Sequence, residues 1–198
     1  MLPSQVPEFE PYPFVHSFVK SHFDMQFDDV RAMMRLPLPE IGIQAGCNFA
    51  AAATLCNLIS GISVVLYTPE DPKGGSGKKF KQLLEEFYPW EPQENREDKA
   101  KTIYDLIRNP LSHSLGVLKK GSLPIGIAKN SLTEAQLEEI ENSKVRPVWV
   151  PLAVAGGPSK YDLSVWGLYW GVFHLVRRLA KDAKQMQKAE ERISEGKI

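Results

Sequence analysis

The feature that most constrains this chain is a run of 29 residues without a formal charge, from Ile41 to Pro69. Such a run is long enough to cross a bilayer as a helix. It also holds amide and hydroxyl side chains, which would be costly in hydrocarbon: Gln44, Asn48, Thr54, Asn57, Ser60 and Ser63. We therefore expect a buried central helix over 43–66 and no membrane partner. A membrane span is the alternative for the run, and a strand is the alternative for its β-branched end at 62–67.

Composition and charge limit the class of protein. The chain has 198 residues, of which 43% are hydrophobic and 24% charged, which fits one globular domain over 1–198. The 24 basic residues balance the 24 acidic ones, which excludes a strongly polycationic binder. The balance is −5 over 1–99 and +5 over 100–198. The second half could attract an anion such as RNA, or pair with acidic surface; a scattered solvated surface is the alternative.

The cysteines and the first residues bear on the cellular setting. Cys47 and Cys56 are too few for a disulfide scaffold and lack the CxxC spacing of a zinc site. The N-terminus has no basic stretch followed by an apolar stretch, as a secretory signal would. We therefore expect a cytoplasmic protein. Four prolines within residues 1–13 predict an extended arm.

Apolar spacing predicts a mainly α fold with about five helices. Between Phe14 and Met34 the apolar residues recur at steps of three and four, as in an amphipathic helix. A shorter helix is predicted over 79–88, packed through Phe80, Leu83, Leu84 and Phe87. A third is expected over 97–118 with an interruption at Pro110, and a long closing helix over 162–193.

A different pattern between residues 120 and 155 predicts a small α/β insertion. Two short apolar runs, 124–128 and 147–154, flank an acidic helix that begins with a capping-box sequence at Thr133. We expect the two runs to pair as a hairpin.

Two familiar kinds of site lack support. The segment Gly74–Lys79 resembles a phosphate-binding loop, but Pro72 and Lys79 stand where that motif requires Gly and Ser or Thr. We therefore expect a basic loop there. No two histidines have the spacing of a helical metal site, so no metal and no cofactor is predicted.

The remaining polar cluster is the segment Arg108–His113, with the sequence RNPLSH. Asn109 can cap a helix with Pro110 at its first position, which would leave N–H groups open to a phosphate. Arg108 adds a planar cation, and His113 adds the side chain that titrates near neutral pH. The alternative is a capped helix start with a packed, hydrogen-bonded histidine.

An Arg followed after four to six residues by His, in a mostly helical chain, resembles the HEPN superfamily. The resemblance implies a helical-bundle core over about 14–118 and 160–195 that acts as a metal-independent endoribonuclease. It also implies that Arg108 and His113 are the catalytic pair and Asn109 their polar assistant. Implied partners are RNA, a second copy and a cognate antitoxin or effector partner, as in toxin–antitoxin and phage-defence systems. Some members of the family have lost catalysis and bind nucleotides or proteins.

The chemistry itself favours a dimer. Cleavage of RNA without a metal needs a base, an acid and positive charge on the phosphorane, and one histidine cannot be in both protonation states at once. A two-fold dimer would supply two copies of His113 and Arg108. Further phosphate contacts are expected from Ser112, Lys119, Lys120, Arg177 and Lys181.

Two features of the predicted closing helix leave alternatives open. Arg177 and Lys181 begin a basic stripe with Lys184 and Lys188, which could follow an RNA backbone or be a solvated face. Gly167 and Gly171 on the same helix allow close backbone approach, either within the chain or between two copies.

Overall fold

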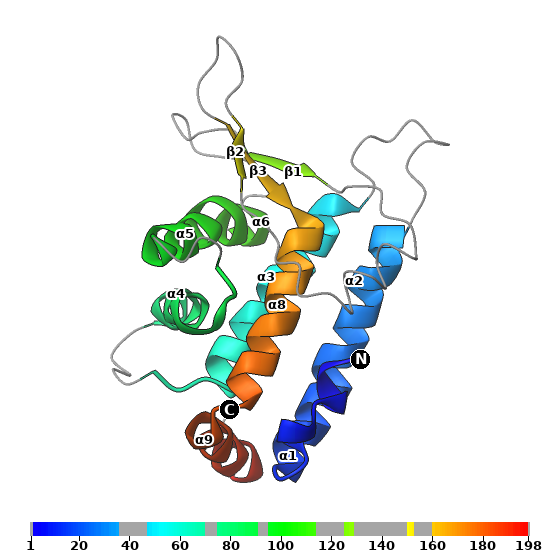
Figure 1. Cartoon of the computed structure of the whole chain (residues 1–198), viewed down its shortest axis with the longest axis vertical. Coiled ribbons are helices and arrows are strands. Elements are labelled where there is room, and N and C mark those ends of the chain that lie inside the picture. Colours follow the sequence, from blue (N-terminus) through cyan, green and yellow to red (C-terminus); the bar gives the residue numbers. More distant parts are fainter. Residues whose placement is uncertain are drawn as a thin grey trace.

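The computed structural model describes residues 2–35, 47–69, 75–90, 95–113, 125–128, 150–152 and 160–197. This part of the chain is mainly helical, with a small three-stranded sheet at one end of the longest axis (Figure 1). The prediction of a mainly α fold is therefore confirmed. The helix predicted at Thr133, Gly74 of the predicted basic loop and the residues Lys119 and Lys120 lie outside the described residues. The prediction of a loop up to Lys79 is wrong, because a helix begins at Ser76.

The first long helix forms as its apolar spacing predicts. It consists of α1 (Pro13–Phe18), a π-helical turn (Val19–Asp24) and α2 (Met25–Arg35), which follow one another without a break. Its buried side chains are those of the predicted stripe: Val15, Val19, Phe23, Phe27, Val30 and Met34. This stripe places the helix against α3 and the rest of the core.

The first twelve residues are not the extended arm that their prolines predict. They form two short 3-10 helices, Pro3–Gln5 and Pro7–Phe9, which bury Val6 and Phe9 completely or nearly so. The fixed φ of proline suits the start of a 3-10 turn as well as extended chain. Apolar burial decides between the two, and the Ser4 hydroxyl adds a hydrogen bond to Asp24 in the π-helical turn.

The charge-free run contains the central helix α3 (Asn48–Val65), which packs against α2, α4 and α8. The β-branched end of the run, for which a strand was the alternative, is thus helical up to Val65. Among the described helices, only α3 is long and apolar enough to cross a membrane, and 56% of its span is buried inside the fold. This burial is that of a core helix, as expected. Its start lies at Asn48, while residues 36–46 lie outside the described part.

Beside α3 lie α4 (Ser76–Phe87) and a helical stretch made of α5 (Arg96–Ile103), a π-helical turn (Tyr104–Arg108) and α6 (Asn109–His113). The helix predicted over 79–88 is confirmed. Phe80, Leu83 and Leu84 are buried in α4, and Phe87 is partly buried.

The single closing helix predicted over 162–193 is wrong. The chain forms α8 (Val165–Ala180) and then α9 (Ala183–Ser194), which runs across the end of α8 (Figure 1). Each begins at a side-chain cap: Ser164 accepts from the Gly167 N–H, and Asp182 accepts from the Gln185 N–H. A capped start separates two helices even where apolar spacing continues.

The sheet has the strand order β1-β3-β2, so the predicted hairpin is also wrong. β1 (Ile125–Ala128) and β2 (Val150–Leu152) fall within the two predicted apolar runs, but both pair with β3 (Lys160–Ser164). β1 is parallel to β3 and β2 antiparallel to it. Residues 160–164 alternate polar and apolar as a strand does. The pattern is short and leads directly into α8, which hides it in the sequence.

Helix α9 is fastened by contacts at the ends of two other helices. The Glu190 carboxylate accepts hydrogen bonds from the N–H groups of Phe14 (3.1 Å) and Val15 (2.8 Å) at the start of α1. The Arg192 guanidinium donates to the carbonyls of Val64 (3.2 Å) and Val65 (2.6 Å) at the end of α3. Each charge has the sign that the helix dipole favours at that end.

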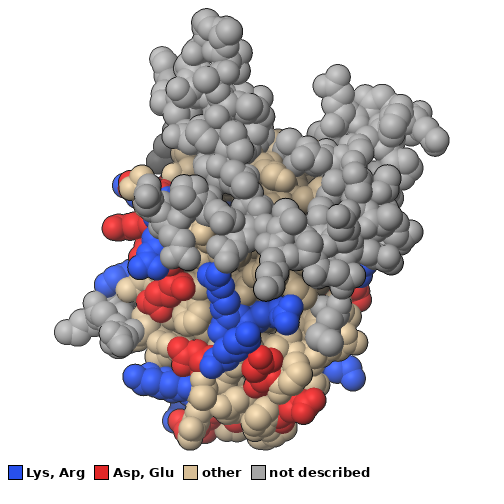
Figure 2. All heavy atoms as spheres, viewed as in Figure 1, with Lys and Arg blue, Asp and Glu red and all other residues tan. Residues whose placement is uncertain are grey.

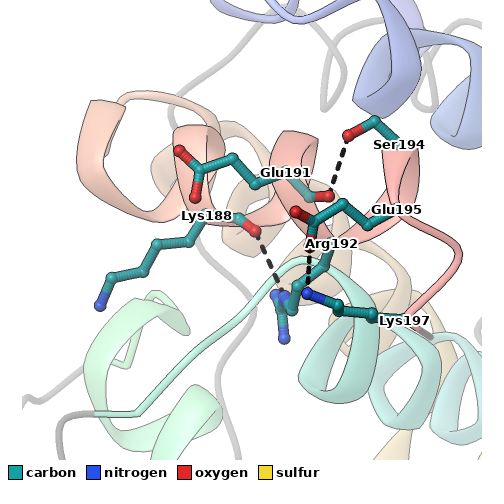
Figure 3. A network of polar contacts seen from close by, with 6 residues as sticks. All are labelled: Lys188, Glu191, Arg192, Ser194, Glu195 and Lys197. Atoms are coloured by element: carbon teal, nitrogen blue, oxygen red, sulfur yellow. Dashed lines mark hydrogen bonds and ion pairs between the residues drawn. The ribbon is translucent and has the colours of Figure 1, made fainter.

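A third contact fixes the same helix. The Gln185 side chain accepts from the Thr68 N–H at 2.8 Å and donates to the Thr68 carbonyl at 2.9 Å. Figure 3 shows the polar side of α9, where Arg192 also donates to the Lys188 carbonyl and Lys197 pairs with Glu195. The described C-terminus is therefore an ordered part of the fold.

Of the two glycines of α8, Gly171 serves packing within the chain. The Tyr88 hydroxyl donates to the Gly167 carbonyl at 3.2 Å. A Cβ added to Gly171 would lie 2.0 Å from the Tyr88 ring. The sequence left open whether another part of the chain or a second copy approaches the glycines of α8. At Gly171 the approach is made within the chain, by the buried side chain of Tyr88.

We expect Gly171→Ala to lower the free energy of unfolding by about 3 kcal/mol, because Tyr88 must move to admit the methyl group. The same substitution at Gly61 in α3, where no atom lies within 4 Å of an added Cβ, should raise it by up to about 1 kcal/mol. Urea unfolding of both variants measures these two changes in the free energy of unfolding, which should have opposite signs. Equal effects would contradict the packing of Tyr88 on α8.

We expect Glu190→Gln to lower the free energy of unfolding by about 1 kcal/mol, because two helix N-terminal N–H groups lose a charged acceptor. The control is Glu191→Gln on the same helix, since Glu191 is exposed and should change stability by less than about 0.5 kcal/mol. Urea unfolding at low salt distinguishes them. Indistinguishable midpoints would contradict the docking of α9 on α1.

We expect one fast-reacting thiol in the folded chain. Cys47 is exposed, whereas Cys56 is 1% exposed and burial raises its pKa to about 12. Since the thiolate is the reactive form, Ellman's reagent at pH 8 should modify one thiol in the native chain and two in urea. Rapid modification of both without denaturant would contradict the burial of α3.

Candidate functional site

The segment Arg108–His113 lies inside a helix rather than at its start. Asn109 has helical dihedral angles (φ −64°, ψ −50°), and its N–H donates to the Tyr104 carbonyl. The predicted interruption at Pro110 and the predicted cap at Asn109 are therefore wrong. Pro110 lacks an N–H and its ring crowds the carbonyl four residues earlier, at Leu106. That carbonyl belongs to the π-helical turn, whose wider backbone admits the proline.

This geometry removes the phosphate site predicted from a helix N-terminus. The helical stretch begins at Arg96, far before Ser112, so Ser112 is not in the first turn after a cap. The N–H groups of a helix interior point along the helix to carbonyls of the preceding turn. Any anion bound at this segment must therefore be held by side chains.

The Arg108 side chain has defined contacts. It is half-buried, and its Nη1 donates to the Oδ1 of Asn109 at 3.1 Å. Its guanidinium carbon lies 5.5 Å from the centre of the Tyr104 ring, which is a cation–π distance. Burial raises the pKa of Cys56, and the charge of Arg108 opposes this shift. The guanidinium is therefore oriented by Asn109 and Tyr104, on a π-helical turn that packs against α3.

The other residues of the motif are only partly described. Ser112 is exposed and lies four residues after Arg108 on α6, so the two share one face of the helix. The backbone of His113 ends α6, but its side chain lies outside the described part. The structure thus brings together Arg108, Asn109 and Ser112 on one helical stretch.

Arg177 and Lys181 lie elsewhere. The Arg177 guanidinium carbon is 5.7 Å from the Phe173 ring in the last turns of α8, and Lys181 is exposed just after that helix. The predicted basic stripe on one helix is wrong, because the chain turns between Lys181 and the start of α9. Figure 1 places this turn at the lower end of α8, whereas α6 lies closer to the sheet. Figure 2 shows Lys and Arg atoms gathered over the lower half of α8, with carboxylates beside them.

Two residues near Arg108 were not found from the sequence. The Tyr104 ring packs on Phe80 of α4 with ring centres 5.4 Å apart, and the Nζ of Lys81 lies 5.5 Å from the Tyr104 ring centre. Tyr104 precedes Arg108 by four residues, a helical spacing that could have indicated the contact. Lys81 belongs to another helix, and no local pattern indicates it.

The chemistry available from the described side chains here is that of cations and of the hydroxyls of Ser112 and Tyr104. Arg108 offers a planar fork for phosphate oxygens, and Lys81 offers a more flexible point charge. Among the described side chains, no three of His, Cys, Asp and Glu are grouped so that they could hold a metal ion. Comparison of the chain with models of protein families, with curated proteins and with solved structures gives no match.

Proposed function

We propose that this chain is a metal-independent endoribonuclease of the HEPN type that acts as a homodimer, as a toxin or phage-defence effector. The observation that carries the proposal is the guanidinium of Arg108, which Asn109 and Tyr104 orient on the helix that ends at His113. An oriented cation five residues before a histidine suits cleavage of a phosphodiester, because histidine can act as acid or base near neutral pH.

The proposed reaction divides its roles between two copies. A neutral His113 accepts the proton of the RNA 2′-hydroxyl, whose oxygen attacks the adjacent phosphorus. A protonated His113 of the second copy donates a proton to the departing 5′-oxygen. The Arg108 guanidinium stabilises the added negative charge of the phosphorane. The products are a 2′,3′-cyclic phosphate and a 5′-hydroxyl. After cleavage one His113 has gained a proton and the other has lost one, and exchange of protons with water restores both.

A second candidate is a catalytically inactive module that binds a nucleotide or a protein. It is favoured by the partial burial of Arg108 and by its existing contacts with Asn109 and Tyr104. A guanidinium held in this way can bind a phosphate without taking part in bond cleavage. The two candidates differ in whether RNA is cut.

We expect the purified chain to cleave total RNA in the presence of a chelator, and His113→Ala to lower the rate by about 10²- to 10⁴-fold, because the acid–base group is removed. Arg108→Gln should also lower the rate strongly. The matched control is His22→Ala, since His22 is exposed on the first long helix and should leave the rate unchanged. The new 5′ ends should accept a phosphate from polynucleotide kinase without prior dephosphorylation.

Two results would contradict the nuclease proposal. Intact RNA after incubation with the unmodified chain would favour the binding module. Equal cleavage by the unmodified chain and by His113→Ala would assign the activity to something other than this motif.

A further inference from the structure

The first two turns of α4 carry a charge pattern that opposes the helix dipole. Lys78 and Lys79 lie in the first turn, Lys81 follows in the second, and the first turn has no acidic residue. The last turn holds Glu85 and Glu86 and no basic residue. Positive charge at a helix N-terminus and negative charge at its C-terminus each destabilise the helix by a few tenths of a kcal/mol. A bound anion near the lysines would offset that cost.

Of these lysines, Lys81 is joined to Arg108 through one aromatic ring. The Lys81 Nζ and the Arg108 guanidinium carbon each lie 5.5 Å from the centre of the Tyr104 ring, so the two cations lie within twice that distance of each other. The ring is fixed by Phe80, at 5.4 Å, and by the backbone of Gly77, where an added Cβ would lie 2.3 Å from the Tyr104 hydroxyl oxygen. Tyr104 thus holds the start of α4 against the helix of Arg108.

Charges of both signs lie near Lys81. Glu85 lies one turn after Lys81 and interacts with it electrostatically, and Asp105 is exposed beside Tyr104. Glu86 and Glu97 act on Glu85 with the same sign of charge, and Lys81 and Arg96 act on it with the opposite sign. Among these groups, Lys81 is the cation that the Tyr104 ring brings close to Arg108.

We propose that Lys81 and Arg108, joined through Tyr104, bind the phosphodiester backbone of single-stranded RNA. The inference rests on the proposed function for its ligand and adds Lys81 as a substrate-binding residue. A flexible ammonium and a planar guanidinium within this distance can contact the same phosphate or neighbouring phosphates.

The test uses the full chain with His113→Ala, which separates binding from cleavage. Binding of a fluorescein-labelled twelve-nucleotide oligouridylate is followed by fluorescence anisotropy between 50 and 200 mM salt. We expect Lys81→Gln to raise Kd about three- to tenfold and to reduce the slope of log K against log salt by about 0.7, the value for one phosphate contact on a single strand. Lys81→Arg should restore the parent behaviour.

The matched control is Lys20→Gln, because Lys20 is exposed on the first long helix, away from this cluster, and should leave Kd and slope unchanged. Circular dichroism and the thermal midpoint establish that each variant is folded. Lys81→Gln binding within twofold of the parent, with the same slope, would overturn the inference. So would displacement of the probe by uridine monophosphate or inorganic phosphate as effectively as by unlabelled oligouridylate, which would indicate a mononucleotide or phosphate site.

The two proposals fail in different experiments. If RNA stays intact with the unmodified chain but Lys81→Gln weakens binding as expected, the nuclease proposal fails and the RNA-binding inference stands. If cleavage depends on His113 but Lys81→Gln binds like the parent, only the inference about Lys81 fails.

Discussion

The structure depends on covering α3, a helix of 18 residues without a charged side chain. Such a helix is stable in water only if its neighbours bury it, and α2, α4 and α8 do so. Its last carbonyls have no partner within the helix, and two of them accept from Arg192. Arg192 lies on α9, and Glu190 of α9 binds the N-terminus of α1. The contact at the end of α3 therefore also determines how the first and last helices meet.

The sequence predicted helices wherever one apolar face decides the structure. For residues 14–34 and for the Phe80 face of α4, the spacing of the apolar residues was enough to predict the helix. Prediction failed where other forces decide. Pro110 stays helical because a π-helical turn precedes it, and Ser164 and Asp182 start helices inside an apolar pattern. The strand at 160–164 forms because residues distant in sequence pair with it on both sides.

The candidate site was predictable to the same extent. Arg108 and Asn109 were found because they are adjacent in sequence, and their hydrogen bond follows from that adjacency. The predicted anion site failed because it required a helix to begin at Asn109, and backbone hydrogen bonding continues through that residue. Lys81 could not be found, since it reaches Tyr104 from another helix. The glycine-rich segment was predicted to be a basic loop, whereas α4 begins at Ser76 and Tyr104 packs against Gly77.

Because Arg108 lies inside a helical stretch, the N–H groups around it are bonded within the helix, and side chains must supply the positive potential next to it. Side chains lose conformational entropy when they bind, and this cost is smaller if folding has already restricted them. Asn109 and Tyr104 restrict Arg108 in this way, and Tyr104 also contacts Lys81. Under both proposals the Tyr104 ring therefore links the cation that would stabilise the phosphorane to the cation that would bind the backbone. A change in that ring would alter binding and cleavage together, whereas changes at Lys81 and His113 would separate them.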